Sequence, residues 1–134
     1  MLFRGGVKCN FVYYYGRKYG SAKDVFWRNA DIFVFPTYYS NECFPLVLLE
    51  AMQHGVACVS TNEGGIPDVI KDGENGLICR KQDAQSLSDC IGRLLDEKEL
   101  REKMGEDGYR KFRKRFTLQA FEDNMCRILR ELSC

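Results

Sequence analysis

Residues 32–36 read IFVFP, a wholly apolar run that a proline ends. A short run of this kind is typical of a strand that is covered on both faces, as in a parallel sheet. Two further apolar runs follow at residues 56–60 and 77–79. Strands that alternate with helices imply parallel pairing through right-handed crossovers. The sequence therefore predicts an α/β fold in which a parallel sheet is flanked by helices.

The segment before the first run contains a further expected strand and helix. Residues 10–15 are aromatic and β-branched and precede Gly16, which predicts a strand that enters a loop. Ser21 is the expected cap of a short helix that ends at Asn29.

The rest of the chain is expected to be mainly helical. A helix opens with Pro45 at its first position and ends at Gly55. From Asp83 onward apolar residues recur at helical spacing, with Asp83 or Ser86 as a cap. Thr117 is the expected cap of a last helix, whose apolar face consists of Leu118, Phe121, Met125, Ile128, Leu129 and Leu132.

Composition limits the classes of protein that fit. The 134 residues suit a single domain over residues 1–134, and a net charge of +1 argues against a nucleic-acid partner. No two of the seven cysteines are spaced as C-x-x-C, so no metal site is predicted. Reduced thiols in a soluble cytoplasmic protein are expected.

Ligands of parallel sheets bind at the carboxyl ends of the strands. Three loops are expected to leave such ends, at residues 16–20, 37–44 and 61–67. Neither a G-x-G-x-x-G nor a P-loop motif is present, so a dinucleotide oxidoreductase or a P-loop enzyme is not expected. The binding site is therefore predicted where these three loops converge.

Two glutamates mark the central loop and the helix after it. Glu50 interrupts a helix that is apolar on nearly every face, where a carboxylate is costly unless it is hydrogen-bonded or faces a ligand. Glu42 lies just before the helix start, whose free N–H groups suit a diphosphate. This arrangement fits a nucleotide-sugar. The alternatives are a helix edge at the surface for Glu50 and a solvated loop acid for Glu42.

These residues resemble the group 1, glycogen-synthase-like glycosyltransferases of GT-B fold. The likeness extends from about Tyr13 to Leu132, with Tyr19-Gly20 and Lys23 fitting the pattern upstream. It is carried by ADIFVFP at 30–36, ECFPLVLLEAM at 42–52, GGIPD at 64–68 and DGENGL at 72–77.

The resemblance implies a Rossmann-like, donor-binding C-terminal half of a two-domain enzyme. Such enzymes transfer a hexose from a nucleotide-diphosphate sugar, with retention and generally without a metal or other cofactor. The acceptor, a carbohydrate or a lipid-linked sugar, binds to an N-terminal domain. This chain is expected to lack that domain and the first strand-helix unit of the donor domain, and therefore to be inactive alone.

The resemblance also assigns residues. Glu50 would bind the ribose hydroxyls and Glu42, the candidate catalytic residue, would contact the transferred sugar. Backbone N–H groups in the segment Cys43-Phe44-Pro45-Leu46 would hold the phosphates, and Gly16-Arg17 would border the base. Cys43 departs from the family, which usually has glycine there, and adds bulk and restricts φ beside the diphosphate.

Other residues have two interpretations each. Lys23 is either a phosphate contact or a solvated lysine. Gly64-Gly65 either lets backbone approach donor or acceptor or forms a plain tight turn. His54 is expected to be a helix-terminal charge rather than a catalytic base. A basic cluster is either a contact with anionic lipid at the inner face of a membrane or, preferably, a solvated face; it consists of Arg110, Lys111, Arg113, Lys114 and Arg115.

Two other functions remain open. The chain is either a non-catalytic module that binds a nucleotide or sugar or associates with another subunit, or part of another GT-B enzyme such as a nucleotide-sugar epimerase. An uncovered sheet edge would also favour a homodimer.

Overall fold

The computed structural model describes residues 12–133. Its centre is a parallel sheet in the order β1-β2-β3, which confirms the predicted fold class. The strands are β1 (Ile32–Phe35), β2 (Ala57–Thr61) and β3 (Gly76–Cys79). Every residue of β2 is buried, as its apolar sequence predicts for a strand between two neighbours and two layers of helices.

Helices connect and cover the strands. They are α1 (Gly20–Asn29), α2 (Leu46–Gln53), α3 (Ile66–Val69), α4 (Ala84–Asp96), α5 (Lys98–Arg115) and α6 (Leu118–Leu132). The caps of two of them are confirmed. The Asp83 side chain accepts a hydrogen bond from the Ser86 N–H at 2.8 Å, and that of Thr117 accepts one from the Ala120 N–H at 3.2 Å.

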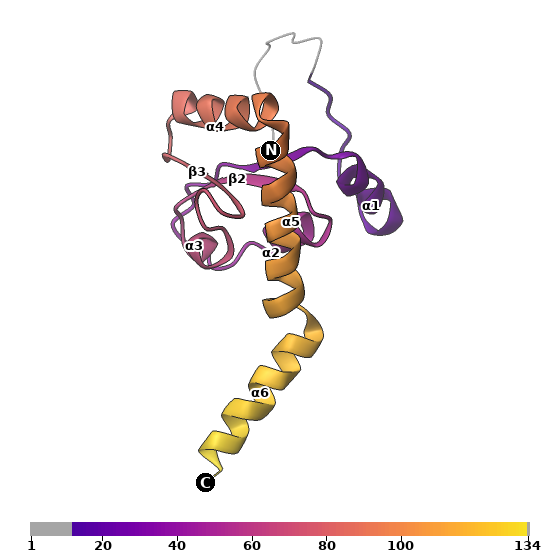
Figure 1. Ribbon diagram of the computed structural model, residues 1–134, viewed down its shortest axis with the longest axis vertical. Coiled ribbons are helices and arrows are strands. Elements are labelled where there is room, and N and C mark those ends of the chain that lie inside the picture. Colours follow the sequence, from indigo (N-terminus) through magenta and orange to yellow (C-terminus); the bar gives the residue numbers. More distant parts are fainter. Residues whose placement is uncertain (1–11, 134) are drawn as a thin grey trace.

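The core has two parts, one on each face of the sheet. Cys58 of β2 packs with Trp27 and with residues of α2 and α3, whereas Val59 packs with Leu94 of α4 and Met104 of α5. Successive residues of a strand point to opposite faces, so the single strand β2 supplies both parts. Helix α5 lies across the front of the sheet in Figure 1 and contacts both.

The prediction of a strand at residues 10–15 is wrong for residues 12–15. These residues lie outside the helices and strands and are exposed, and residues 10 and 11 lie outside the described part of the chain. Val12 and Tyr13–Tyr15 have a strand-like composition, but β1 pairs only with β2 among the described residues. A strand needs a neighbour for its backbone hydrogen bonds, and composition alone does not supply one.

Two helix starts also differ from prediction. Helix α1 begins at Gly20 with Tyr19 as its N-cap, which makes no side-chain capping hydrogen bond; Ser21 lies inside the helix and is not the cap. Pro45 is the N-cap of α2 rather than its first helical residue. Gly55 follows the C-cap His54 with φ +68°, the left-handed conformation expected of a helix stop.

The last helix stands apart from the rest. Helix α6 projects away from the sheet (Figure 1), and none of its residues is buried. Its predicted apolar face is therefore bare. Within residues 12–133 the chain forms no helix with the length and apolar character needed to cross a membrane.

Candidate functional site

Two of the three predicted loops pack together at the carboxyl edge of the sheet. The Ser60 hydroxyl donates to the Phe35 carbonyl at 2.8 Å, and the Thr61 hydroxyl donates to the carbonyl of Thr37. These bonds tie the ends of β1 and β2 to each other where their loops begin. The Gly65 N–H then donates to the Cys43 carbonyl at 2.9 Å, which joins the loops themselves.

Glycine is required on one side of this contact. A Cβ at Gly64 would lie 1.5 Å from the Glu42 carbonyl oxygen, and one at Gly65 would lie 2.2 Å from that of Cys43. Gly64 also has φ +49°, which L side chains rarely adopt. The pair therefore allows backbone to approach backbone, and it fixes the position of the segment that carries Glu42.

The start of α2 lies directly after this segment. Pro45 is buried and makes no side-chain hydrogen bond to the first turn, while Leu46, the first helical residue, is exposed. The first N–H groups of a helix have no partner within it. The ring of Phe44 lies 6.0 Å from that of Phe116, which anchors this end of α2 to the end of α5.

Glu50 has a partner that sequence reasoning missed. Its side chain is about a third exposed, and its Oε2 forms an ion pair with Nζ of Lys23 on α1. The same oxygen is buried and, apart from this ion pair, has no hydrogen-bond partner among residues 12–133. The structure thus places Lys23 against Glu50, one turn beyond Leu46, and the two form one charged unit beside the start of α2.

Helix α1 is held in place at the far end of α2. Nδ1 of His54 lies 2.8 Å from the Glu50 carbonyl oxygen, and its Nε2 lies 3.9 Å from a carboxylate oxygen of Asp24. The imidazole also stacks on Trp27 with ring centroids 6.0 Å apart. His54 therefore lies where α1 and α2 meet, in agreement with the predicted position at a helix end.

The remaining predicted loop does not join the other two. Gly16 and Arg17 lie in an exposed segment, and a Cβ at Gly16 would meet no atom within 4 Å. The candidate site therefore consists of Glu42–Leu46, Gly64–Gly65 and the pair Lys23–Glu50.

Two aromatic side chains of the loop at residues 37–44 were not among the predicted site residues. Tyr38 and Tyr39 are 62% and 60% exposed. With Thr37 and Ser40 they line a hollow of about 420 Å³. The Tyr39 carbonyl accepts a hydrogen bond from the Glu42 N–H at 2.9 Å, so this hollow lies close to the backbone of the candidate catalytic residue. Two consecutive tyrosines after Pro36 were the available signal.

Comparison with known proteins identifies the family of this chain. The family model of the group 1 glycosyl transferases matches residues 9–111, and the chain belongs to that family. It is 39% identical over 94 residues to N-acetyl-alpha-D-glucosaminyl L-malate synthase of Bacillus anthracis, with 67% of this chain and 25% of that protein covered. The chain thus spans about a quarter of that relative's length.

Solved structures show the same architecture. Sucrose-phosphate synthase from Thermosynechococcus elongatus is similar at a TM-score of 0.72 and 30% identity, covering 81% of this chain and 27% of that one. Anabaena HepE, solved in complex with UDP-glucose, gives a TM-score of 0.71 at 19% identity, covering 78% and 29%. The fold is that of the C-terminal domain of a GT-B glycosyltransferase.

Proposed function

We propose that this chain is the donor-binding domain of a retaining glycosyltransferase that transfers a hexose from a nucleotide-diphosphate sugar. The observation that carries the proposal is the backbone contact between Gly64-Gly65 and Glu42-Cys43. It holds a carboxylate just before a helix start, and a second carboxylate follows one turn into the helix. Carboxylates on either side of an anion seat match a sugar, a diphosphate and a ribose in series.

Each group then has a defined role. The Glu50 carboxylate accepts hydrogen bonds from the ribose hydroxyls, and the ion pair with Lys23 orients that carboxylate. Backbone N–H groups of Cys43, Phe44 and Leu46 hold the diphosphate, with Pro45 having none to offer, and Glu42 contacts the transferred sugar. The exposed rings of Tyr38 and Tyr39 offer an apolar face to a sugar beside it. Gly16 and Arg17 border the base only if their segment moves inward.

Catalysis in this scheme rests on position and charge. Preorganised N–H donors at the start of α2 stabilise the negative charge that grows on the departing diphosphate. The acceptor, a carbohydrate or a lipid-linked sugar, is supplied by another domain that faces this loop edge, and the reaction needs both halves to bring the reactants together. We assign no protein nucleophile, metal or other cofactor. A cytoplasmic location fits the buried reduced thiols of Cys58 and Cys79.

Calorimetric titration of the chain with UDP, GDP and ADP tests this proposal. We expect one nucleotide to bind and Glu50→Ala to weaken it about tenfold or more, since a lost charged hydrogen-bond partner costs ~1.5–3 kcal/mol. Glu131→Ala is the matched control, because Glu131 lies on α6 and pairs only with Arg127 among the described residues. Equal affinity in Glu50→Ala and Glu131→Ala would overturn the donor site.

The bare face of α6 favours a second function, association with another protein surface. Its occupant would be the acceptor-binding part of the enzyme or, through α6 or the free side of β1, a second copy of this chain. A folded chain that binds no nucleotide but sediments as a dimer would favour this non-catalytic role.

A further inference from the structure

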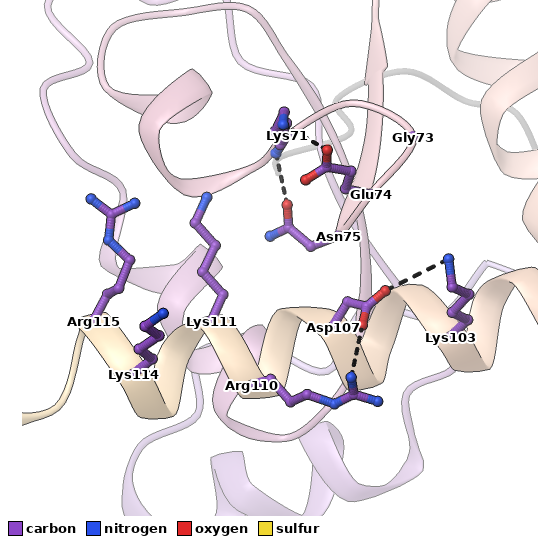
Figure 2. Close-up of a pocket in the computed structure, with 10 residues that line it drawn as sticks. All are labelled: Lys71, Gly73, Glu74, Asn75, Lys103, Asp107, Arg110, Lys111, Lys114 and Arg115. Atoms are coloured by element: carbon purple, nitrogen blue, oxygen red, sulfur yellow. Dashed lines mark hydrogen bonds and ion pairs between the residues drawn. The ribbon is translucent and has the colours of Figure 1, made fainter.

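A separate pocket lies on the flank of α5. It has a volume of about 580 Å³ and lies between this helix and the turn at residues 71–75 that precedes β3. Figure 2 shows its lining side chains, with the α5 residues along one wall and Lys71, Glu74 and Asn75 opposite. None of the lining residues belongs to the donor-site loops at 37–46 and 61–67, so the function proposed above does not use this pocket.

This pocket is much more positively charged than the chain as a whole. Its walls carry six basic side chains and two carboxylates, whereas the entire chain has a formal net charge of +1. The basic residues are Lys71, Lys103, Arg110, Lys111, Lys114 and Arg115. Positive charge is therefore concentrated here, and its mutual repulsion is unfavourable without an anion.

Neighbouring acids compensate only part of this charge. Lys71 pairs with Glu74 at 2.6 Å, and Arg110 pairs with Glu106 at 2.7 Å. Asp107 lies 3.9 Å from Lys103 and 3.6 Å from Arg110. The two carboxylates that line the pocket, Glu74 and Asp107, are thus paired with Lys71, Lys103 and Arg110.

Three cations at the end of α5 have no such match. Within residues 12–133 no carboxylate forms an ion pair with Lys111, Lys114 or Arg115. The Lys111 ammonium donates to the Val69 carbonyl at 2.7 Å. Burial lowers the pKa of Lys111 and the nearby charge of Arg115 lowers it further, while the charges of Glu74 and Asp68 act in the opposite direction. In Figure 2 Lys111 and Arg115 point from α5 toward the side on which Lys71 lies.

The helix end accounts for only part of this arrangement. Cations in a last turn are favourable beside the free carbonyls of a helix, which suits Lys114 and Arg115. It does not explain Lys111, which already has a carbonyl partner on another element, nor the presence of Lys71 across the pocket. A group with several acceptor oxygens and a double negative charge would contact all of these donors at once.

We propose that this pocket binds phosphate groups, held by Lys111, Lys114 and Arg115 with Lys71 on the opposite wall. Guanidinium and ammonium groups are the donors that proteins use for phosphate, and their bonds to it are charge-assisted. The ligand is a phosphorylated compound, either free in solution or presented as a lipid headgroup. The site is distinct from the diphosphate seat at the start of α2.

Nuclear magnetic resonance on the isotope-labelled chain, titrated with inorganic pyrophosphate, locates the binding. We expect saturable shifts of the amides of Gly73, Asn75 and residues 111–115. Lys114→Ala with Arg115→Ala should weaken this binding about tenfold, because two charge-assisted bonds are lost. Arg113→Ala with Lys98→Ala removes the same charge from α5 outside the pocket and should change the affinity less than about twofold. Circular dichroism checks that both double variants fold.

Pyrophosphate binding in this pocket can be distinguished from pyrophosphate binding at the proposed donor site. Pyrophosphate at the start of α2 would shift the amides of residues 44–47, and neither double variant should change that response. Shifts at residues 111–115 that do not saturate, or that weaken equally in the two double variants, would overturn the proposal.

Vesicles identify the source of the phosphate. Sedimentation with phosphatidylglycerol vesicles but not with phosphatidylcholine vesicles, lost in Lys114→Ala/Arg115→Ala and kept in the control, supports a lipid headgroup. Saturable pyrophosphate binding without vesicle binding supports a soluble phosphorylated ligand. Absence of both would overturn the site.

Discussion

Substitution of Gly64 by alanine tests the close contact of this residue with Glu42. Gly64→Ala adds a methyl 1.5 Å from a carbonyl oxygen, at φ +49°, so the two loops must separate. We expect a loss of roughly 2–4 kcal/mol of unfolding free energy in urea titration, together with weaker nucleotide binding.

Gly73→Ala is the matched control for this loss. Gly73 has φ +77°, but a Cβ there meets nothing within 4 Å, so only the backbone strain of about 1 kcal/mol should appear. Equal losses in the two variants would mean that the close approach of the loops contributes nothing.

The buried thiol of Cys58 predicts a dependence of stability on pH. Burial raises the pKa of this thiol from an ordinary 9.0 to about 12. The folded state therefore keeps the proton where the unfolded state loses it, and this contribution to stability is lost as the pH rises from about 9 to about 12, by up to ~1.4 kcal/mol per pH unit. Urea titrations at several pH values measure it. Cys58→Ala, which has no thiol, should show a shallower decline over this range; the same slope in both proteins would contradict the assignment.

Cysteine reactivity tests the site loop directly. Cys43 is exposed in the loop before α2, whereas Cys58 and Cys79 are buried. The thiolate is the reactive form, so at about pH 8 an alkylating reagent should modify Cys43 quickly and the buried pair only after unfolding. Peptide mass spectrometry follows each site. A bound nucleotide should slow the modification of Cys43 and leave the rate at exposed Cys126 unchanged; equal slowing at both would place the nucleotide elsewhere.

Among the helices and strands, the features that depend only on local sequence were predictable. The apolar run of β1, the two helix caps and the glycine stop after α2 were all confirmed from local sequence. The strand expected at residues 12–15 was wrong, because a strand depends on a neighbouring strand that local sequence does not reveal. The pair Lys23–Glu50 was missed for the same reason: its two members are 27 positions apart and meet only when α1 packs on α2.

Removal of α6 tests whether this helix contributes to the stability of the domain. Because no residue of α6 is buried, a chain that ends at Phe116 should keep its cooperative unfolding transition within about 1 kcal/mol and lose mainly helical signal. Urea unfolding followed by circular dichroism measures both. If α6 mediates association, the shortened chain should also sediment as a monomer where the longer one does not. A large loss of stability would show that α6 packs on the domain.

For the whole molecule, the proposed donor site would link nucleotide binding to stability. Its parts come from α1, α2 and the loops after β1 and β2, so unfolding destroys all of them together. A nucleotide at about 100 times its dissociation constant should therefore raise the unfolding free energy by about 2.7 kcal/mol. Thermal unfolding with and without nucleotide measures this, and Glu50→Ala should remove most of the gain. The proximity of the two loops was predictable from strand order, whereas their mutual contact depends on a backbone approach that only the structure reveals.

The contact between the two loops also bears on how this site can change. Gly64 and Gly65 meet carbonyl oxygens of Glu42 and Cys43, not their side chains. Cys43 is exposed, and Gln82 is the one residue other than glycine with positive φ in the described part of the chain, so the backbone at position 43 does not require glycine. Side chains at this position are therefore free to vary without loosening the loop. A mutational library at position 43 is thus a natural route to altered donor choice on an unaltered scaffold.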